Sequence, residues 1–272
     1  MNINIEKFLN NNLNNLIEIA QNAGYEIMKI YNSDFEYNTK KDGSPLTSAD
    51  LAAHNCIYGG LSALDSKIPI LSEESKLVKF AERSKWEKYW LIDPLDGTKE
   101  FIKRNGEFTV NISLILNKKP VLGIIFAPDL DSMFFAIKNN GCFELDNNNR
   151  KQLKVMSSDK KIKVIGSRSH QNEKLDSLLG HIGEYEYVGS GSSLKFCMIA
   201  NNTAHIYPRF SPTSEWDTAA GQAIVEESGG KVLNDIGETL SYNSKESLRN
   251  PNFVAFGNID SLVLDNFYKV LK

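Results

Sequence analysis

Residues 89–101, YWLIDPLDGTKEF, are the stretch that decides the fold. The apolar run from Trp90 to Ile92 is typical of the end of a buried strand. Two carboxylates follow, Asp93 and Asp96, and the proline between them restricts the residue before it to extended geometry. A Gly-Thr pair then opens a short helical pattern. We therefore expect acids where a strand ends and backbone N–H groups where a helix begins, a combination that suits a phosphate ester bound through divalent metal.

The composition of the 272-residue chain, with 41% hydrophobic and 24% charged residues, is typical of a globular protein of one or two domains. A net charge of −3 gives no reason to expect a nucleic-acid polymer as a partner. Three cysteines far apart in the chain predict reduced thiols in a cytoplasmic protein. The N-terminus lacks the basic flank and apolar region of a signal peptide, and no stretch approaches the length of a membrane span, so we expect any association with the inner membrane to be peripheral. The oligomeric state stays open.

The residues before about 158 are predicted to form an N-terminal α+β domain, 1–158. A loop is expected at 40–45, the segment 74–88 is either helix or surface loop, and the strand series is expected to break at 147–149. The other predicted elements are helices at 5–31 and 47–61 and strands at 68–72, 90–92, 108–114, 121–126 and 133–137.

The residues after about 160 alternate between strand and helix patterns, which predicts a C-terminal α/β domain, 159–272. A Gly-Ser-rich turn at 189–193 is expected to open a helix that ends near residue 201. The other predicted elements are strands at 164–167, 185–188, 205–208, 232–233 and 253–256 and helices at 173–179, 217–227 and 261–271.

Five acids invite a joint interpretation because each follows a predicted strand or begins a predicted helix. They are Glu73, Glu74, Asp93, Asp96 and Asp217. Carboxylates held close together repel one another unless cations bind between them. Sites rich in carboxylate oxygen suit Mg²⁺, and two such ions roughly 4 Å apart can activate water and neutralise a leaving alkoxide. The acids together therefore predict a magnesium site.

Each acid also has a simpler interpretation when it is taken alone. The dipeptide at Asp96 and Gly97 is common in turns. Asp217 could be a first-turn acid that interacts with the helix dipole. Glu73 and Glu74 could be two solvated residues. The metal site is favoured only because all of these acids occur together.

Three motifs carry a resemblance to a known family. They are Ser72-Glu73-Glu74, Asp93-Pro94-Leu95-Asp96-Gly97-Thr98 and Trp216-Asp217-Thr218-Ala219-Ala220-Gly221. With these motifs in this order, nearly the whole chain resembles the lithium-sensitive, magnesium-dependent phosphatase superfamily of the inositol monophosphatases. The resemblance implies the layered αβαβα sugar-phosphatase fold, α+β in its N-terminal part and α/β in its C-terminal part.

The resemblance also implies roles for the acids. Glu73, Asp93 and the Leu95 carbonyl would hold one Mg²⁺, and Asp93, Asp96 and Asp217 would hold a second. The backbone N–H groups of Gly97 and Thr98 would take phosphate oxygens. Thr98 would pair with Asp50 to orient the attacking water, and Glu74 would accept a proton from the water network. Asp50 has a structural alternative, because Thr47-x-x-Asp50 also resembles a capping box.

A narrower resemblance points to the bisphosphate nucleotidases of this superfamily, and stretches 93–111, 191–197 and 207–210 carry it. It implies that His170, Ser192, Lys195 and Arg209 bind the nucleotide. Cationic and hydrogen-bonding groups of this kind suit a phosphate that is not cleaved. The alternatives are that Lys195 is a surface residue of an amphipathic helix and that His170 lies in an exposed turn.

The expected activity is Mg²⁺-dependent hydrolysis of the 3′-phosphate of adenosine 3′,5′-bisphosphate to AMP, with the sulfated analogue as a second substrate, in sulfur assimilation. Water would attack phosphorus in line with the leaving oxygen. Two rivals remain. One is a phosphatase of the same fold that acts on inositol or fructose phosphates, and the other is a nucleotide sensor that binds without turnover.

Overall fold

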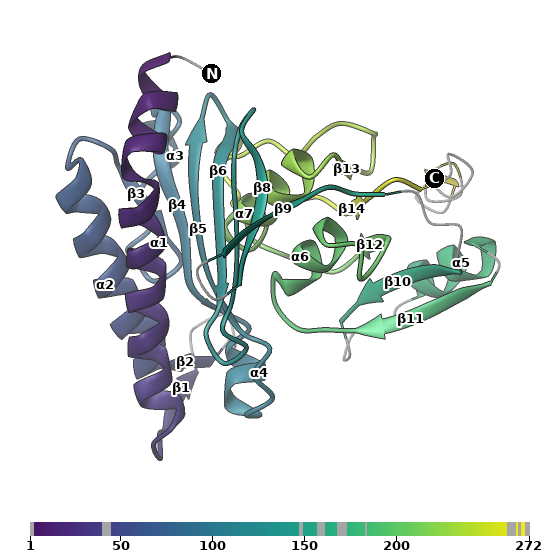
Figure 1. Cartoon of the computed structure of the whole chain (residues 1–272), viewed down its shortest axis with the longest axis horizontal. Coiled ribbons are helices and arrows are strands. Elements are labelled where there is room, and N and C mark those ends of the chain that lie inside the picture. The colour runs from purple at the N-terminus through teal and green to yellow at the C-terminus, as the bar shows by residue number, and fades with distance from the viewer. Residues whose placement is uncertain are drawn as a thin grey trace.

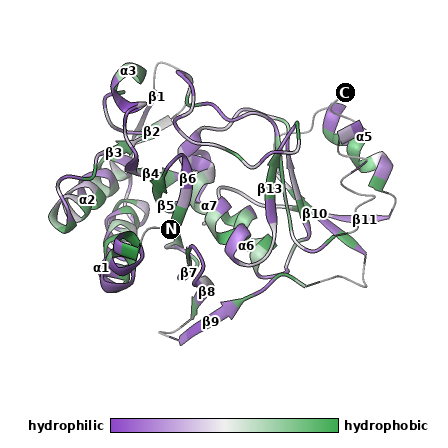
Figure 2. Cartoon of the chain, turned by 90° about the horizontal axis from the view of Figure 1, so that it is seen from above, coloured by the Kyte–Doolittle hydropathy of each residue, from purple (hydrophilic) through white to green (hydrophobic). Residues whose placement is uncertain are grey.

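The computed structural model describes residues 3–39, 45–146, 149–156, 161–167, 173–182 and 184–259, together with residues 265, 268 and 269. Two sheets alternate with layers of helices in the order helix, sheet, helix, sheet, helix (Figure 1 and Figure 2). The predicted layered αβαβα arrangement is therefore confirmed.

The first sheet has seven strands that lie side by side in chain order. Its first two strands are parallel, and every later neighbour is antiparallel. Its central strands are buried along nearly their whole length, which explains their almost continuous apolar sequence. The strands are β3 (Ile70–Ser72), β4 (Lys88–Asp96), β5 (Thr109–Leu116), β6 (Lys119–Ala127), β7 (Ser132–Ile137), β8 (Gly141–Asp146) and β9 (Asn149–Leu153).

Helices α1 (Ile3–Tyr31) and α2 (Ser48–Leu64) cover one face of this sheet (Figure 2). The apolar residues of α1 recur every three or four positions, and this stripe is buried against the sheet. A short hairpin of β1 (Tyr37–Thr39) and β2 (Pro45–Thr47) precedes α2. Three-residue strands are too short to show a period, so the sequence does not predict this hairpin.

Helices α6 (Leu194–Ala200) and α7 (Glu215–Glu227) lie between the two sheets. Gly123 of β6 lets α7 approach the first sheet, because a Cβ atom at this position would lie 2.3 Å from the carbonyl oxygen of Ala220. The tight contact places the first turn of α7, with Asp217, beside the strands that carry the other acids.

The second sheet has five strands and lies beyond these helices. Helix α5 (Glu173–Ile182) covers its outer face through a cluster that includes Leu178 and Val164. In spatial order the strands are β11 (Tyr185–Gly189), β10 (Ile162–Gly166), β12 (Ile206–Arg209), β14 (Phe253–Phe256) and β13 (Lys231–Asn234). β10 is parallel to β11 and β12, whereas β14 is antiparallel to β12 and β13.

Several sequence expectations need correction or fall outside the described residues. The strand series does not break at 147–149, because β8 and β9 continue the first sheet. The undecided segment 74–88 contains one short helix, α3 (Phe80–Arg83), and the other residues before β4 are irregular. The domain boundary near 158 falls on residues that are not described, so the two-domain division stays a prediction. Of the predicted helix at 261–271, only 265, 268 and 269 are described, and they are helical.

All three cysteines are free thiols, as predicted, and two of them are buried. In the described part of the chain, no helix combines the length and the apolar character needed to cross a bilayer.

Candidate active site

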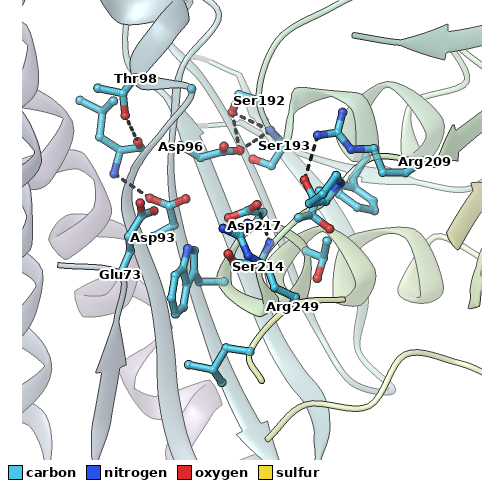
Figure 3. A pocket seen from close by; sticks show the side chains of 18 of the residues that line it. Glu73, Asp93, Asp96, Thr98, Ser192, Ser193, Arg209, Ser214, Asp217 and Arg249 are labelled. Atoms are coloured by element: carbon cyan, nitrogen blue, oxygen red, sulfur yellow. Dashed lines mark hydrogen bonds between the residues drawn. The ribbon is translucent and has the colours of Figure 1, made fainter. Parts of the chain in front are cut away.

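A cavity of about 890 Å³ brings together residues from both sheets and from α7. Most of the predicted site residues line it. These are Glu73, Asp93, Leu95, Asp96, Gly97, Thr98, Ser192, Lys195, Arg209 and Asp217. Acidic and cationic side chains therefore line a single cavity, as a site for a phosphate ester bound through metal would require (Figure 3).

Three acids from three elements meet in this cavity. Glu73 follows β3, Asp93 lies in β4, and Asp217 lies in the first turn of α7. β3 and β4 are parallel neighbours, so their carboxyl ends present Glu73 and Asp93 side by side (Figure 3). One carboxylate oxygen from each of the three acids lies within 4.8 Å of the others. This arrangement could hold a metal ion.

The electrostatics of the cluster fit a hard divalent cation. Asp93 is only 2% exposed, and burial together with the nearby carboxylates of Glu73 and Asp96 raises its pKa well above the usual range. Burial and the carboxylates of Asp96 and Glu73 raise the pKa of Asp217 in the same way. Carboxylate oxygens crowded at this cost suit Mg²⁺ or a similar ion, because bound positive charge would remove the repulsion.

Strand β4 does not end before the acids, as the sequence suggested, but runs through Asp96. Asp93 pairs with Asn111 and Asp96 with Thr109, and the register shifts between these two pairs. Pro94 has no N–H group for the ladder, which accounts for the irregularity. The shift lets the Leu95 amide donate to Asp93 Oδ1 at 3.1 Å and directs Asp96 toward the 190–193 turn.

Gly97 forms the corner between β4 and the short helix α4 (Thr98–Ile102). Its φ of 90° lies in the left-handed region, and a Cβ atom here would lie 3.1 Å from the carbonyl oxygen of Glu107. The conformation therefore favours glycine, and a Cβ atom would also make an unusually tight contact. The predicted role of the Gly97 and Thr98 amides in phosphate binding stays a prediction.

Asp50 serves two structural roles at once. Its Oδ2 accepts hydrogen bonds from the backbone N and from Oγ1 of Thr47, each at 2.7 Å, so the capping box considered from the sequence is present. Its Oδ1 lies 3.3 Å from the Thr98 hydroxyl, which also lies 3.3 Å from the Leu95 carbonyl oxygen. The predicted Asp50–Thr98 pair therefore exists, and the cap holds it in place. Asp217 is likewise both a cluster acid and a capping residue, since its Oδ2 accepts from the Ser214 amide at 2.9 Å.

The cationic side of the cavity is built on the 190–193 turn. Lys195 is 5% exposed, which excludes the surface role, and its Nζ donates to the carbonyl oxygens of Ser190 and Ser192. Burial lowers the pKa of Lys195 to about 8. Arg209 lines the same wall and donates to the Pro212 carbonyl oxygen at 3.4 Å.

Two of the described candidate residues, Asp50 and Glu74, do not line the cavity. The backbone N–H of Glu74 donates to the Ser72 hydroxyl at 3.3 Å. His170 lies outside the described residues. The roles given to these three residues stay predictions.

Two groups of polar residues were not predicted from the sequence. Thr109, Asn111 and Ser193 form a buried cluster beside Asp96. The polar residues at alternate positions of the buried strand β5 are the sequence feature that could have indicated this cluster. The second group is the buried side chain of Arg83, which bonds to Asn243 and to the Glu246 carbonyl oxygen. The Asn243 amide donates to Glu215 at 2.7 Å. No pattern in the sequence indicated the second group.

Comparison with known proteins gives a consistent result. A model of the inositol monophosphatase family matches residues 9–260. The 3′(2′),5′-bisphosphate nucleotidase CysQ of Salmonella typhimurium is 48% identical over 243 residues, which cover 89% of this chain and 98% of that protein. The CysQ protein of Escherichia coli K12 is 45% identical over the same shares.

The solved structures agree with these sequence matches. The crystal structure of CysQ from Bacteroides thetaiotaomicron superposes with a TM-score of 0.79 and 37% identity, covering 92% of this chain and 98% of that one. The family match over most of the chain, the identity to these relatives and the shared fold lead to one conclusion: the chain belongs to the inositol monophosphatase family.

Proposed function

We propose that the protein is a metal-dependent phosphatase that hydrolyses the 3′-phosphate of adenosine 3′,5′-bisphosphate to AMP and phosphate. The sulfated analogue is proposed as a second substrate, and the setting as sulfur assimilation in the cytoplasm. One observation carries the proposal: a crowded acid cluster and a buried lysine beside an arginine line a single cavity. The names of the relatives at 45–48% identity support the choice of a nucleotide bisphosphate.

The acid side would hold two or more Mg²⁺ ions. Glu73, Asp93 and the Leu95 carbonyl would hold one ion, and Asp93, Asp96 and Asp217 a second. When bound, the metal would neutralise the phosphoryl oxygens and the leaving 3′-oxygen and would lower the pKa of water. Enzymes of this family are metal-dependent. The clustered carboxylates suit Mg²⁺ better than softer metals.

The remaining residues would orient the reactants. Asp50 Oδ1 and the Thr98 hydroxyl would orient the attacking water, and Glu74 would accept a proton from the water network. The oxygen of this water would form a bond to phosphorus while the bond to the 3′-oxygen breaks on the opposite side. Lys195, Arg209 and Ser192 would hold the phosphate that is not cleaved.

A phosphate-release assay tests the proposal, with adenosine 3′,5′-bisphosphate, inositol 1-phosphate and fructose 1,6-bisphosphate as substrates in Mg²⁺ and in a chelator. We expect the nucleotide to give the highest kcat/KM and the chelator to abolish activity. Preference for a sugar phosphate would overturn the substrate assignment. Nucleotide binding without phosphate release from any substrate would indicate a sensor and overturn the enzymatic proposal.

A further inference from the structure

Asp96 is joined to a polar cluster that we call the Asp96 cluster, formed by Thr109, Asn111, Ser192 and Ser193 (Figure 3 shows Asp96 and the two serines). Thr109, Asn111 and Ser193 are each at most 2% exposed. The Ser192 hydroxyl donates to Asp96 Oδ2 at 2.9 Å, and the Ser193 amide donates to the same oxygen at 2.6 Å. Asp96, which the family resemblance makes a metal ligand, is thus also bound to the 190–193 turn.

Thr109 stands at the centre of the cluster. Its Oγ1 lies 2.5 Å from Ser192 Oγ, 2.7 Å from Ser193 Oγ and 3.0 Å from the Asn111 side-chain oxygen. Ser193 Oγ also lies 2.7 Å from that Asn111 oxygen. With the Ser192–Asp96 bond, these are five oxygen–oxygen contacts.

The protons of the cluster do not suffice for these contacts. Thr109, Ser192 and Ser193 each contribute one hydroxyl proton, and an ionised Asp96 contributes none. Three protons cannot serve five contacts, and two pairs of oxygens at hydrogen-bonding distance would repel. At the same time the Asn111 Nδ2 group is buried without a hydrogen-bond partner among the described residues. One rearrangement of the Asn111 side chain would both give its NH₂ group hydrogen-bond partners and supply the missing protons.

We propose that the Asn111 side-chain amide is turned so that its NH₂ group faces Thr109 and Ser193, and that Thr109 is a positioning residue for Asp96. The NH₂ group adds two protons, which makes five protons for five contacts. Each of the five contacts then has a proton only if the donors and acceptors are arranged in one way. Asn111 donates to Thr109 and to Ser193, Ser193 donates to Thr109, Thr109 donates to Ser192, and Ser192 donates to Asp96.

The direction of this relay has a consequence for Asp96. Its Oδ2 accepts from both Ser192 and Ser193, so the cluster fixes the orientation of a carboxylate that would help to hold a divalent ion. The relay also holds Ser192, whose φ of 52° is an uncommon conformation for a residue other than glycine. Thr109 therefore holds both Asp96 and the 190–193 turn in place. The metal-ligand role of Asp96 rests on the proposed function.

Metal binding without substrate tests this role. The dissociation constant of Mn²⁺ is measured by calorimetry for the wild type, Thr109→Val and Thr109→Ser, together with thermal unfolding of the metal-free proteins. Residues that orient metal ligands typically contribute about 10- to 100-fold in affinity. We expect Thr109→Val to weaken Mn²⁺ binding about 10-fold and Thr109→Ser, which keeps the hydroxyl, to restore it.

Ser113→Ala is the matched control. Ser113 lies on the same strand and donates to the Leu122 carbonyl oxygen at 2.7 Å, but it has no bond to the Asp96 cluster. It should bind Mn²⁺ like the wild type. Unchanged Mn²⁺ affinity in Thr109→Val, or equal weakening in Ser113→Ala, would overturn the positioning role.

A neutron crystal structure of the wild type tests the amide orientation independently of any variant. Deuterons on the Asn111 atom that faces Thr109 would support the proposal, and an oxygen at this place would refute it. Neither measurement uses turnover. Failure of the proposed nucleotidase activity in the phosphate-release assay would therefore be distinguishable from failure of this inference.

Discussion

At the scale of single residues, Asp93 is the acid on which the site depends most. It is buried, and carboxylates of Glu73, Asp96 and Asp217 surround it. An ionised carboxylate in this position is unfavourable in the metal-free protein and favourable when metal is bound. Its contributions to function and to stability therefore oppose each other.

Asp93→Asn should lower phosphatase activity by at least about 100-fold, because it removes a shared metal-binding carboxylate. The same change should raise the melting temperature of the metal-free protein at neutral pH, because it removes a repelled buried charge. Phosphate release and calorimetry in a chelator measure the two effects. Asp131→Asn, at an exposed turn with a φ of 44°, is the control and should alter neither.

The pH dependence of metal-free stability follows from the same acid. An aspartate in an unfolded chain has a pKa of about 3.9, and the folded pKa of Asp93 is higher. Between these two values the folded protein binds more protons than the unfolded chain, so the free energy of unfolding falls as the pH rises. Asp93→Asn should weaken this fall. An equally steep fall in the variant would contradict the assignment.

Lys195 predicts a second pH effect, on catalysis. Its pKa is lowered to about 8 by burial, so the ammonium group loses its charge above this pH. If it holds a phosphate, kcat/KM for adenosine 3′,5′-bisphosphate should fall above about pH 8, since kcat/KM reports the ionisation of the free enzyme. Lys195→Arg should remove this fall. Lys119→Arg, at a lysine that bonds to Thr239 and Leu240, is the control and should keep it.

At the scale of elements, the corner between β4 and α4 joins the acids to the helix start. Gly97 has a positive φ and close neighbours on two other segments, the carbonyl oxygen of Glu107 at 3.1 Å and Ser192 at 3.2 Å from a Cβ placed on it. The corner thus contacts the 190–193 turn directly. A substitution at Gly97 should therefore displace both the acids of β4 and this turn.

Gly97→Ala should destabilise the protein by about 1–2 kcal/mol, because a side chain is strained at this φ. Activity should fall further than stability alone explains, since Ser192 must move. Gly180→Ala is the control, because a Cβ at this helical glycine has nothing within 4 Å. Chemical denaturation and kcat/KM of the two variants give the comparison. Wild-type activity in Gly97→Ala would contradict the role of the corner.

At the scale of the whole molecule, Arg83 ties the segment after Glu73 to the first turn of α7. Its guanidinium bonds to Asn243 and to the Glu246 carbonyl oxygen, and Asn243 bonds back to the Arg83 carbonyl oxygen at 2.5 Å and to Glu215. Glu215 is the first residue of α7 and lies in the same helical turn as Asp217. This link helps to hold the acids of different layers together against their repulsion.

Arg83→Met should destabilise the protein by about 1–3 kcal/mol for each acceptor left unsatisfied, because the Asn243 side-chain oxygen and the Glu246 carbonyl oxygen lose their donor. Arg104→Met is the comparison. Arg104 also bonds to two backbone carbonyl oxygens, those of Tyr31 and Ser33, but it is exposed. Its loss should cost roughly 1 kcal/mol. Urea denaturation measures both, and equal losses would contradict a special role for Arg83.

The sequence by itself determined the local chemistry. The strand before Asp93, the helices that begin near Thr47 and Glu215, and the layered fold follow from periodicity, capping patterns and family motifs, all of which depend on neighbouring residues. The same reasoning predicted one site for five acids, because motifs at strand ends and helix starts reveal where a carboxylate lies along the chain. The structure brings the carboxylates of three of them, Glu73, Asp93 and Asp217, within 4.8 Å of one another.

Only the tertiary structure decided how these residues act on one another. Burial of Lys195, the relay through Thr109 and the Arg83 link join segments that are far apart in the chain, so no sequence period records them. The run of β4 through Pro94 is another example, because the pairing of Asp96 with Thr109 restores the strand after the proline. The stretch YWLIDPLDGTKEF thus specifies the acids and the glycine corner that follows them, whereas the contacts that orient each acid come from packing between layers.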